Sequence, residues 1–381
     1  MPWESKTVEK LREEFVLAAQ GNHNFSSLCR EFGITRKTGY KWLERYVSGA
    51  ELKDLSRKPK LIANKTPNNI EQIILTLRSE NPGWGAKTIK KVLENRGHQN
   101  IPCVKTVNNI LDRNGCIIKE ESEKRQKYIR FQRERCNEMW QTDFKGDFEL
   151  TDGGRCYPLD IIDDCSRYLI KIVPSANTKN VVIPAFESAF SEYGMPQSVL
   201  SDNGGQFAGF KQGYTQFEKW LMCLDILPIH CRIKHPQTQG KIERFHRTLN
   251  DELLRYNTFE NINHANENIQ AWREKYNNIR PHEALNMLTP ADVYIKSNRP
   301  YTGIIKPYEY SGNYPILKVN CKGYISFEFQ RLYFSETFIG EYIEFRPNPL
   351  GDSFFACFRN FRIAEFDSIS GKRINRSIYR L

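Results

Sequence analysis

The stretch "VLSDNGGQFAGF", residues 199–210, has the pattern of a short buried strand that ends at Asp202 and breaks into Asn203-Gly204-Gly205. Glycines after a strand favour a sharp turn, because they adopt backbone conformations that other residues avoid. The aspartate at such a strand end has two interpretations: it is a turn residue, or it is one ligand of a metal site. The choice depends on whether the chain supplies other carboxylates that can meet Asp202.

Two further carboxylates are candidates. Asp143 lies within residues 139–150, "MWQTDFKGDFEL", whose alternation predicts a strand, and aspartate is disfavoured inside strands. Glu243 lies near the start of a predicted helix and projects beside its buried stripe, which consists of Ile242, Phe245, Leu249 and Leu253. Carboxylates brought together repel one another unless a cation neutralises them. Oxygen ligands select hard ions, so Mg²⁺ is the expected ion and Mn²⁺ its substitute.

The segments around these acids alternate between strands and helices, which is typical of an α/β domain. A pair of strands is predicted within residues 156–175, joined through Asp163 and Asp164, which we interpret as hairpin residues rather than ligands. A helix follows, capped by Thr178 and ended by Gly194. The remaining predictions are a helix at residues 214–225, a strand at 226–233 and a long helix at 237–256.

Charge divides the chain unevenly. The net charge is +11; up to residue 135 there are 27 Lys and Arg against 16 Asp and Glu, and the remainder holds 29 against 29. The whole excess therefore lies in the N-terminal third. This asymmetry indicates a module that binds a polyanion, joined to regions with a different role.

The first part of this basic third has a helix-turn-helix pattern. A short helix is predicted from Ser26 to Phe32, followed by Gly33, and Thr35 is a good N-cap for a helix that runs to Val47. Ile34, Trp42, Leu43 and Tyr46 can pack inward. The other face of this second helix then carries the candidate DNA contacts, which are Arg36, Lys37, Tyr40, Lys41 and Arg45. The alternative is a small helical bundle with a solvated charged face.

Further helices follow a basic linker. Residues 67–118 predict three helices, broken at Asn81-Pro82-Gly83 and at Gly97, and resemble a second helix-turn-helix unit. Their last helix has few cations, so a purely structural role stays open. Residues 119–137 form a charged connector, whose basic half can follow a phosphate backbone.

The last eighty residues change pattern again. From Tyr301 onward, short alternating segments with tight turns predict a small antiparallel β-barrel. The basic tail "GKRINRSIYRL" does not decide between DNA binding and subunit contact. The ten cysteines are scattered, with no Cys-x-x-Cys pair, so we interpret them as reduced thiols. No run of 18 apolar residues or apolar leader is present, so we expect a cytoplasmic protein with no membrane contact.

Four motifs in order resemble the catalytic core of bacterial insertion-sequence transposases of the DDE superfamily, which includes retroviral integrases. They are "WQTDFKG", "LSDNGGQF", "HPQTQGKIERFHRTLNDEL" and "YNNIRPHEALNMLTPADVY", within residues 136–295. The resemblance implies a ribonuclease-H-like fold with Asp143, Asp202 and Glu243 as catalytic and metal-binding residues. It also implies two metal ions, cleavage and joining of double-stranded DNA at element ends and target, and a homo-oligomer on the DNA.

The resemblance is incomplete at one position. Many relatives carry a Lys or Arg two turns after the catalytic Glu, where this chain has Asn250; Arg247 is a substitute. Other expected phosphate contacts around the site are His235, Lys241 and Arg244. His235 and His246 flank Glu243, and we interpret them as residues that position DNA or cap the helix rather than as a general base.

The sequence therefore predicts a multidomain transposase. Its rivals are a ribonuclease-H-like nuclease that cleaves without joining and a catalytically silent repressor derived from a transposase. The expected domains are a helix-turn-helix domain (1–52), a basic linker (53–66), a second helix-turn-helix-like domain (67–118), a connector (119–137), an α/β ribonuclease-H-like core (138–298) and a small all-β barrel (299–381).

Overall fold

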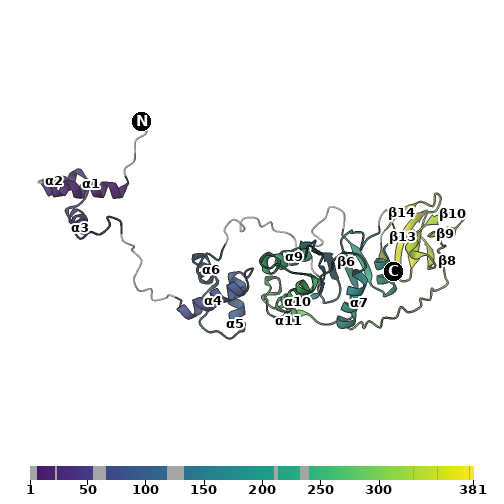
Figure 1. Ribbon diagram of the computed structural model, residues 1–381. Coiled ribbons are helices and arrows are strands. Elements are labelled where there is room, and N and C mark those ends of the chain that lie inside the picture. The colour runs from purple at the N-terminus through teal and green to yellow at the C-terminus, as the bar shows by residue number, and fades with distance from the viewer. Residues whose placement is uncertain are drawn as a thin grey trace. The chain divides into compact units, whose positions relative to one another are not determined.

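The computed structural model describes residues 7–21, 24–54, 66–117, 133–209, 213–231, 240–328, 330–349, 351–376 and 378–381 (Figure 1). The chain divides into two compact units, Met1–Lys65 and Thr66–Leu381. None of the described helices combines the length and the apolar character that a membrane crossing requires.

The first unit holds three helices, α1 (Val8–Gln20), α2 (Phe25–Glu31) and α3 (Arg36–Val47). Thr35 caps α3 as predicted, because its side chain accepts a hydrogen bond from the Thr38 amide. Gly33 has a φ of 63° between α2 and α3, the conformation that a helix-ending glycine supplies. The core contains Phe15, Val16, Leu28, Cys29 and Trp42. Tyr46 was expected to pack inward, which is wrong, since it is 37% exposed.

The second unit begins with three helices, α4 (Asn68–Glu80), α5 (Ala86–Asn95) and α6 (Val104–Arg113), as the breaks in the sequence predicted. Their apolar faces share one core. The expected second helix-turn-helix unit is thus three packed helices.

The central sheet follows in the order β5-β4-β1-β6-β7. Strands β4 and β5 run antiparallel to their neighbours, whereas β1, β6 and β7 are mutually parallel. The bounds are β1 (Trp140–Phe144), β4 (Leu159–Asp163), β5 (Leu169–Val173), β6 (Ser198–Ser201) and β7 (Leu227–His230). The strand predicted across residues 139–150 is shorter than expected: the chain leaves β1 near Gly146 (φ 91°) and forms a separate hairpin of β2 (Phe148–Glu149) and β3 (Arg155–Cys156).

Helices pack on both faces of this sheet. Ile161 belongs to the apolar core with α7 (Val182–Tyr193) and α8 (Gln216–Cys223), whereas its neighbour Ile162 belongs to the core with α9 (Gly240–Glu252) and α10 (Ile262–Asn278). Adjacent strand residues point to opposite faces, which explains the division. Gly194 ends α7 with a φ of 76°, as predicted. The predicted cap at Thr178 is wrong: α7 begins at Val182 without a side-chain cap. Short α11 (Pro290–Val293) follows α10.

The C-terminal region is all-β, as predicted. One sheet has the order β14-β13-β12-β11-β8, with β15 also pairing with β13, and β9 pairs with β10. The strands are β8 (Ile316–Lys318), β9 (Tyr324–Phe327), β10 (Gln330–Tyr333), β11 (Tyr342–Pro347), β12 (Ser353–Phe358), β13 (Phe361–Asp367), β14 (Arg373–Asn375) and β15 (Tyr379–Arg380). Within the described residues the end strands β14 and β8 do not pair, so closure into a barrel stays a prediction.

Candidate active site

Asp143 and Asp202 lie at the same edge of the central sheet. Strands β1 and β6 are parallel, with Trp140 opposite Val199 and Gln141 opposite Leu200, so the same register continues toward Asp143 and Asp202. Phe144 packs in the core under α7 and α8, and alternation therefore puts Asp143 on the sheet face that α9 covers. The two aspartates thus lie near the carboxyl ends of adjacent parallel strands.

The Asp143 carboxyl is partly buried. Burial raises its pKa to about 6 from 3.8, because a poorly solvated carboxylate is costly; the charge on Asp202 acts in the same direction, and His246 opposes both. One of its oxygens accepts the backbone N–H of Phe144 at 2.8 Å. A cation bound beside Asp143 would stabilise its carboxylate against burial and against the charge of Asp202.

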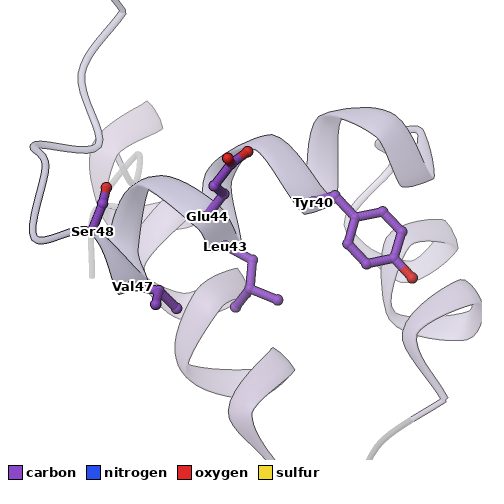
Figure 2. A pocket seen from close by; sticks show the side chains of 5 residues that line it. All are labelled: Tyr40, Leu43, Glu44, Val47 and Ser48. Carbon is purple, nitrogen blue, oxygen red and sulfur yellow. The ribbon is translucent and has the colours of Figure 1, made fainter.

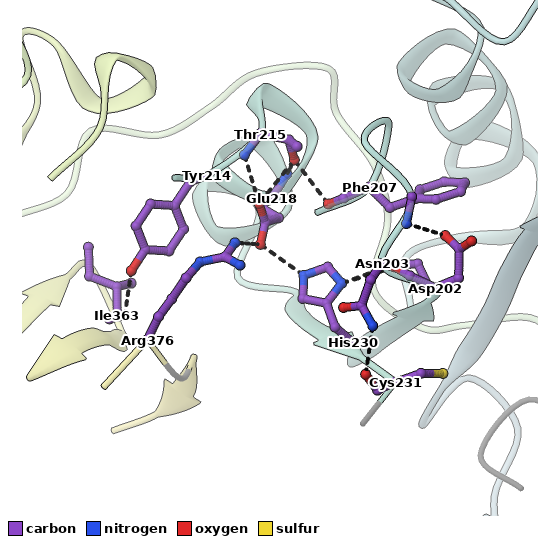
Figure 3. A network of polar contacts seen from close by, with 12 residues as sticks. Asp202, Asn203, Phe207, Tyr214, Thr215, Glu218, His230, Cys231, Ile363 and Arg376 are labelled. Atoms are coloured by element: carbon purple, nitrogen blue, oxygen red, sulfur yellow. Dashed lines mark hydrogen bonds and ion pairs between the residues drawn. The ribbon is translucent and has the colours of Figure 1, made fainter. Parts of the chain in front are cut away.

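Asp202 is held by the turn that follows β6. Its Oδ1 accepts the Gly204 amide at 2.9 Å, and the Asn203 side chain donates to the Cys231 carbonyl at 2.9 Å (Figure 3). Neither Gly204 nor Gly205 has a positive φ, so the sharp turn needs no left-handed conformation. The reason for glycine is space instead, since a Cβ at position 204 would lie 2.9 Å from Asp202 Oδ1.

Glu243 is exposed in the first turn of α9. The predicted buried stripe is confirmed: Ile242, Phe245 and Leu249 are buried, and Leu253 lies just beyond the helix at 8% exposure. The thiol of Cys231, just after β7, experiences the charges of Glu243 and of both aspartates. Burial raises the pKa of that thiol to about 11, and the charges of Asp202, Asp143 and Glu243 all act in the same direction.

The three predicted carboxylates therefore all act electrostatically on one thiol. Across the described residues, no three His, Cys, Asp or Glu side chains are already arranged to hold a metal ion. The three carboxylates nevertheless fit Mg²⁺ or Mn²⁺, because all of them supply oxygen ligands. Two of them also interact, since the charge of Asp202 raises the pKa of Asp143. Residues 232–239 precede α9 and lie outside the described residues, so the predicted contact His235 does too.

Lys241 was expected to contact phosphate, but its position argues against this. Its side chain is 13% exposed, and its ammonium lies 2.5 Å from the buried carboxylate of Asp164. Burial lowers the pKa of Lys241 to about 8, with Arg167 acting in the same direction. Arg244 and Arg247 are exposed on α9 and remain candidates.

The hairpin acids have structural contacts, as expected. Asp163 accepts hydrogen bonds from the Asn137 amide at 2.8 Å and from the Ser166 hydroxyl at 2.6 Å. Asp164 accepts from the Gln141 side chain at 2.7 Å. Both are fully buried, which explains why they need these donors.

Sequence reasoning missed Asp160 on β4, the cross-strand partner of Asp143. It is fully buried and accepts a hydrogen bond from His246 Nε2 at 2.6 Å. The signal that singled out Asp143, an aspartate inside a strand, was equally present at Asp160. It also missed the polar contacts among Glu218, His230 and Arg376, because these residues belong to no common sequence motif.

On α3 the predicted DNA contacts differ in exposure. Arg36, Lys37, Tyr40 and Lys41 are exposed, although the Tyr40 ring stacks on Phe25 with centroids 4.3 Å apart. Arg45 is half-buried: its guanidinium lies 4.9 Å from the Trp42 ring centroid and donates to the Lys53 carbonyl at 2.8 Å. Arg45 is therefore a poor candidate for DNA.

A shallow hollow lies next to the basic face of α3 and shares Tyr40 with it. Figure 2 shows its lining, which consists of Tyr40, Leu43, Glu44, Val47 and Ser48. These residues recur at helical spacing and are mostly apolar, so this face differs in chemistry from the basic face that begins at Arg36.

Family models match along most of the chain's length. Two models described as integrase core domain match residues 133–236 and 224–290. A helix-turn-helix domain model matches residues 11–60, and a homeodomain-like domain model matches residues 38–111.

Insertion-element proteins are among the relatives. The IS407 uncharacterized 31.7 kDa protein of Burkholderia multivorans is 30% identical over 161 residues, 42% of this chain and 56% of that protein. The IS476 uncharacterized 39.2 kDa protein of Xanthomonas euvesicatoria is 29% identical over 41% of this chain and 43% of that protein. A transposase for an IS21-like element of Bacteroides fragilis is 24% identical over 58% of this chain and 46% of that protein. The chain thus spans about half the length of these relatives.

Among solved structures, the chain is similar to a simian T-cell lymphotropic virus intasome in complex with PP2A regulatory subunit B56 gamma. That match has 16% identity and a TM-score of 0.35, and covers 64% of this chain and 82% of the other. The integrase core models, the helix-turn-helix models and the insertion-element relatives agree in order along the sequence. The chain therefore carries N-terminal helix-turn-helix segments and an integrase core, and it is similar to insertion-element proteins.

Proposed function

We propose that this protein binds the terminal inverted repeats of an insertion sequence and catalyses metal-dependent cleavage and strand transfer of DNA. The observation that supports the proposal is the placement of Asp143 and Asp202 near the carboxyl ends of two adjacent parallel strands, with Glu243 acting electrostatically on the same thiol as both, that of Cys231. Asp202 raises the pKa of Asp143, and acids that interact in this way are costly without a cation, which argues against a purely structural role.

These three carboxylates are the proposed catalytic and metal-binding residues. When bound, a pair of Mg²⁺ ions supplies activation of the attacking oxygen and stabilisation of the leaving oxygen of a phosphodiester. The Gly204 amide orients the Asp202 carboxylate through Oδ1, and the Phe144 amide does the same for Asp143. A water oxygen first displaces the 3′ oxygen at the element end, and the freed 3′-hydroxyl then displaces an oxygen in a target strand.

DNA recognition is assigned to the N-terminal helices. In this proposal, residues 1–52 and 67–118 read the terminal repeat, residues 53–66 and 119–137 connect the parts, and 138–298 form the core. Residues 299–381 form a small barrel that contacts DNA or another subunit. Two element ends must react together, so a homo-oligomer assembled on double-stranded DNA is the expected active species.

The test compares Asp202→Asn with Asp152→Asn in the full-length chain. Asp152 is a matched control because its Oδ1 accepts the Gly154 amide at 2.8 Å, the same two-residue turn bond that Asp202 makes with Gly204. If Asp202 were only a turn residue, the two substitutions would have similar effects.

The substrate is a labelled duplex that carries the inverted repeat flanking the gene, with Mg²⁺ or Mn²⁺ and a target plasmid. We expect nicking at the repeat boundary and joined products with wild type and Asp152→Asn, and neither with Asp202→Asn. Cleavage without joined products would support the plain nuclease instead. Specific binding without any cleavage by wild type would support the repressor.

A further inference from the structure

Glu218 is a fully buried acid at the centre of a polar network (Figure 3). Its Oε2 closes the N-terminus of α8, accepting the Thr215 amide at 2.7 Å. Its Oε1 serves two distant residues: His230 Nε2 on β7 lies at 2.8 Å, and the Arg376 guanidinium lies at 2.6 Å. One carboxylate thus joins the core helix α8, the core strand β7 and the C-terminal region.

His230 carries the network to Asp202. Its Nδ1 lies 3.2 Å from the Ser201 hydroxyl and 3.4 Å from the Asp202 carbonyl oxygen. A carboxylate oxygen has no proton to give, so Nε2 donates to Glu218 and the ring orientation is set by that bond. With Nε2 as the donor to Glu218, His230 contacts the end of β6 through Nδ1 and the Ser201 hydroxyl, next to the start of the Asp202 turn.

Arg376 reaches Glu218 from the segment after β14. Its guanidinium lies 4.7 Å from the ring centroid of Tyr214, and the Tyr214 hydroxyl donates to the Ile363 carbonyl on β13 at 2.5 Å. Tyr214 and Met222 also pack within the apolar core of the C-terminal region. These contacts hold the C-terminal region against α8 and keep Arg376 in place.

The ion pair between Arg376 and Glu218 stabilises the carboxylate that orients the His230 ring. Glu218 has no exposed surface, and Arg376 is 20% exposed at its side chain, so their attraction is only weakly screened by solvent. Removing one partner of a buried ion pair leaves an uncompensated charge, which is strongly unfavourable. Glu218 would then draw solvent or move, and His230 would lose the acceptor that orients it.

We propose that Arg376 is a positioning residue of the active site: the C-terminal region orders the Asp202 turn through Glu218 and His230. This inference rests on the proposed function in assigning a catalytic role to Asp202. It makes the C-terminal region a part of the catalytic machinery, because the site is fully ordered only when that region is docked.

Arg380→Met is the matched control. Arg380 is also a C-terminal arginine that pairs with a core carboxylate, that of Asp225 at 3.0 Å, but both side chains are more than 40% exposed. None of its described contacts reaches Glu218 or His230. Arg376→Met and Arg380→Met therefore remove similar docking contacts and differ in their connection to Asp202. Arg376→Lys keeps the charge and tests rescue.

The first measurement is hydrogen exchange of the full-length, metal-free chain, followed by mass spectrometry of peptides across residues 198–208. We expect exchange there to be about tenfold faster in Arg376→Met than in wild type, because local opening is no longer opposed by the network. Arg376→Lys and Arg380→Met should stay within about twofold of wild type, since both keep a cation at Glu218. This readout does not depend on catalysis.

The second measurement is the Mn²⁺ concentration that half-saturates cleavage of the terminal-repeat duplex. Loss of a residue that orients a metal ligand typically costs about tenfold or more, and we expect this for Arg376→Met but not for Arg380→Met. Equal exchange rates in the two Met variants, or a failure of Arg376→Lys to restore protection, would overturn the inference. Absence of cleavage by wild type with the exchange difference intact would overturn the proposed function but leave the coupling established.

Discussion

His246 Nε2 lies 2.6 Å from Asp160 Oδ2, and this pair joins helix α9 to the strand that faces Asp143. Asp160 is fully buried, and its second oxygen has no hydrogen-bond partner in the described structure. Glu243 lies one turn before His246 on the same helix. The pair thus fixes the position of one candidate ligand relative to another.

Substitution of His246 should destabilise the fold. His246→Ala leaves the Asp160 charge buried without a donor, so we expect the free energy of unfolding in urea to fall by about 3 kcal/mol. The double substitution Asp160→Asn/His246→Gln should recover most of this loss, because no uncompensated charge remains. The exposed neighbour Arg247→Ala serves as a control. A double variant no more stable than His246→Ala would contradict the interpretation that Asp160 needs His246 as its hydrogen-bond donor.

The metal-free protein should gain stability from Asp143→Asn at neutral pH. The pKa of Asp143 is raised to about 6 in the folded chain from its ordinary value of 3.8. A group whose pKa rises on folding contributes its stability below the unfolded pKa and loses it as the pH rises through the folded pKa. At pH 8 we expect Asn to stabilise by up to about 3 kcal/mol, and by less where solvent screens the site.

At pH 4 the same substitution should be nearly neutral, because the folded protein then holds Asp143 protonated. Thermal unfolding in the presence of a chelator at pH 4 and pH 8 measures the difference. A stability change independent of pH would show that Asp143 is not the titrating group.

His282 should give the opposite pH dependence. Burial, followed by the charge of Arg280, lowers the pKa of His282 to about 3 from 6.5. A group whose pKa falls on folding contributes stability above the unfolded pKa and loses it as the pH falls toward the folded value. Between pH 7 and pH 5 this single group should cost about 2 kcal/mol of unfolding free energy. His282→Gln should flatten that slope, whereas His98→Gln, at an exposed position, should leave it unchanged.

Two exposed cations on α3 should dominate the salt dependence of DNA binding. Arg36→Ala and Lys37→Ala should each weaken binding to the terminal repeat and lower the slope of log affinity against log salt by about 1. Arg45→Ala should leave that slope unchanged, because its guanidinium packs on Trp42 and bonds to Lys53. Fluorescence anisotropy of a labelled duplex at several salt concentrations tests this. Equal slope changes at all three positions would place Arg45 on the DNA as well.

Helix caps and helix ends were predictable from the sequence, because they depend on residues a few positions apart. The Thr35 cap, the break at Gly33 and the end of α7 at Gly194 follow from side-chain and backbone preferences within a few residues. The prediction failed at Thr178, because α7 begins at Val182 and no side chain caps it. It also failed for Tyr46, whose position on α3 was compatible with burial but which is 37% exposed.

The sequence alone predicted the order of the three regions, the mixed α/β core and three candidate carboxylates, one inside a strand, one at a strand end and one near the start of a helix. Periodicity and residue type carry that information over short spans of chain. Only the tertiary structure decided that Lys241 turns to Asp164, that His246 meets Asp160 and that Arg376 shares Glu218 with His230. These pairs join residues 77 to 158 positions apart, or belong to strands and helices that meet only in the folded chain. An unpaired charge is costly only when it is buried, and burial exists only after the core has formed.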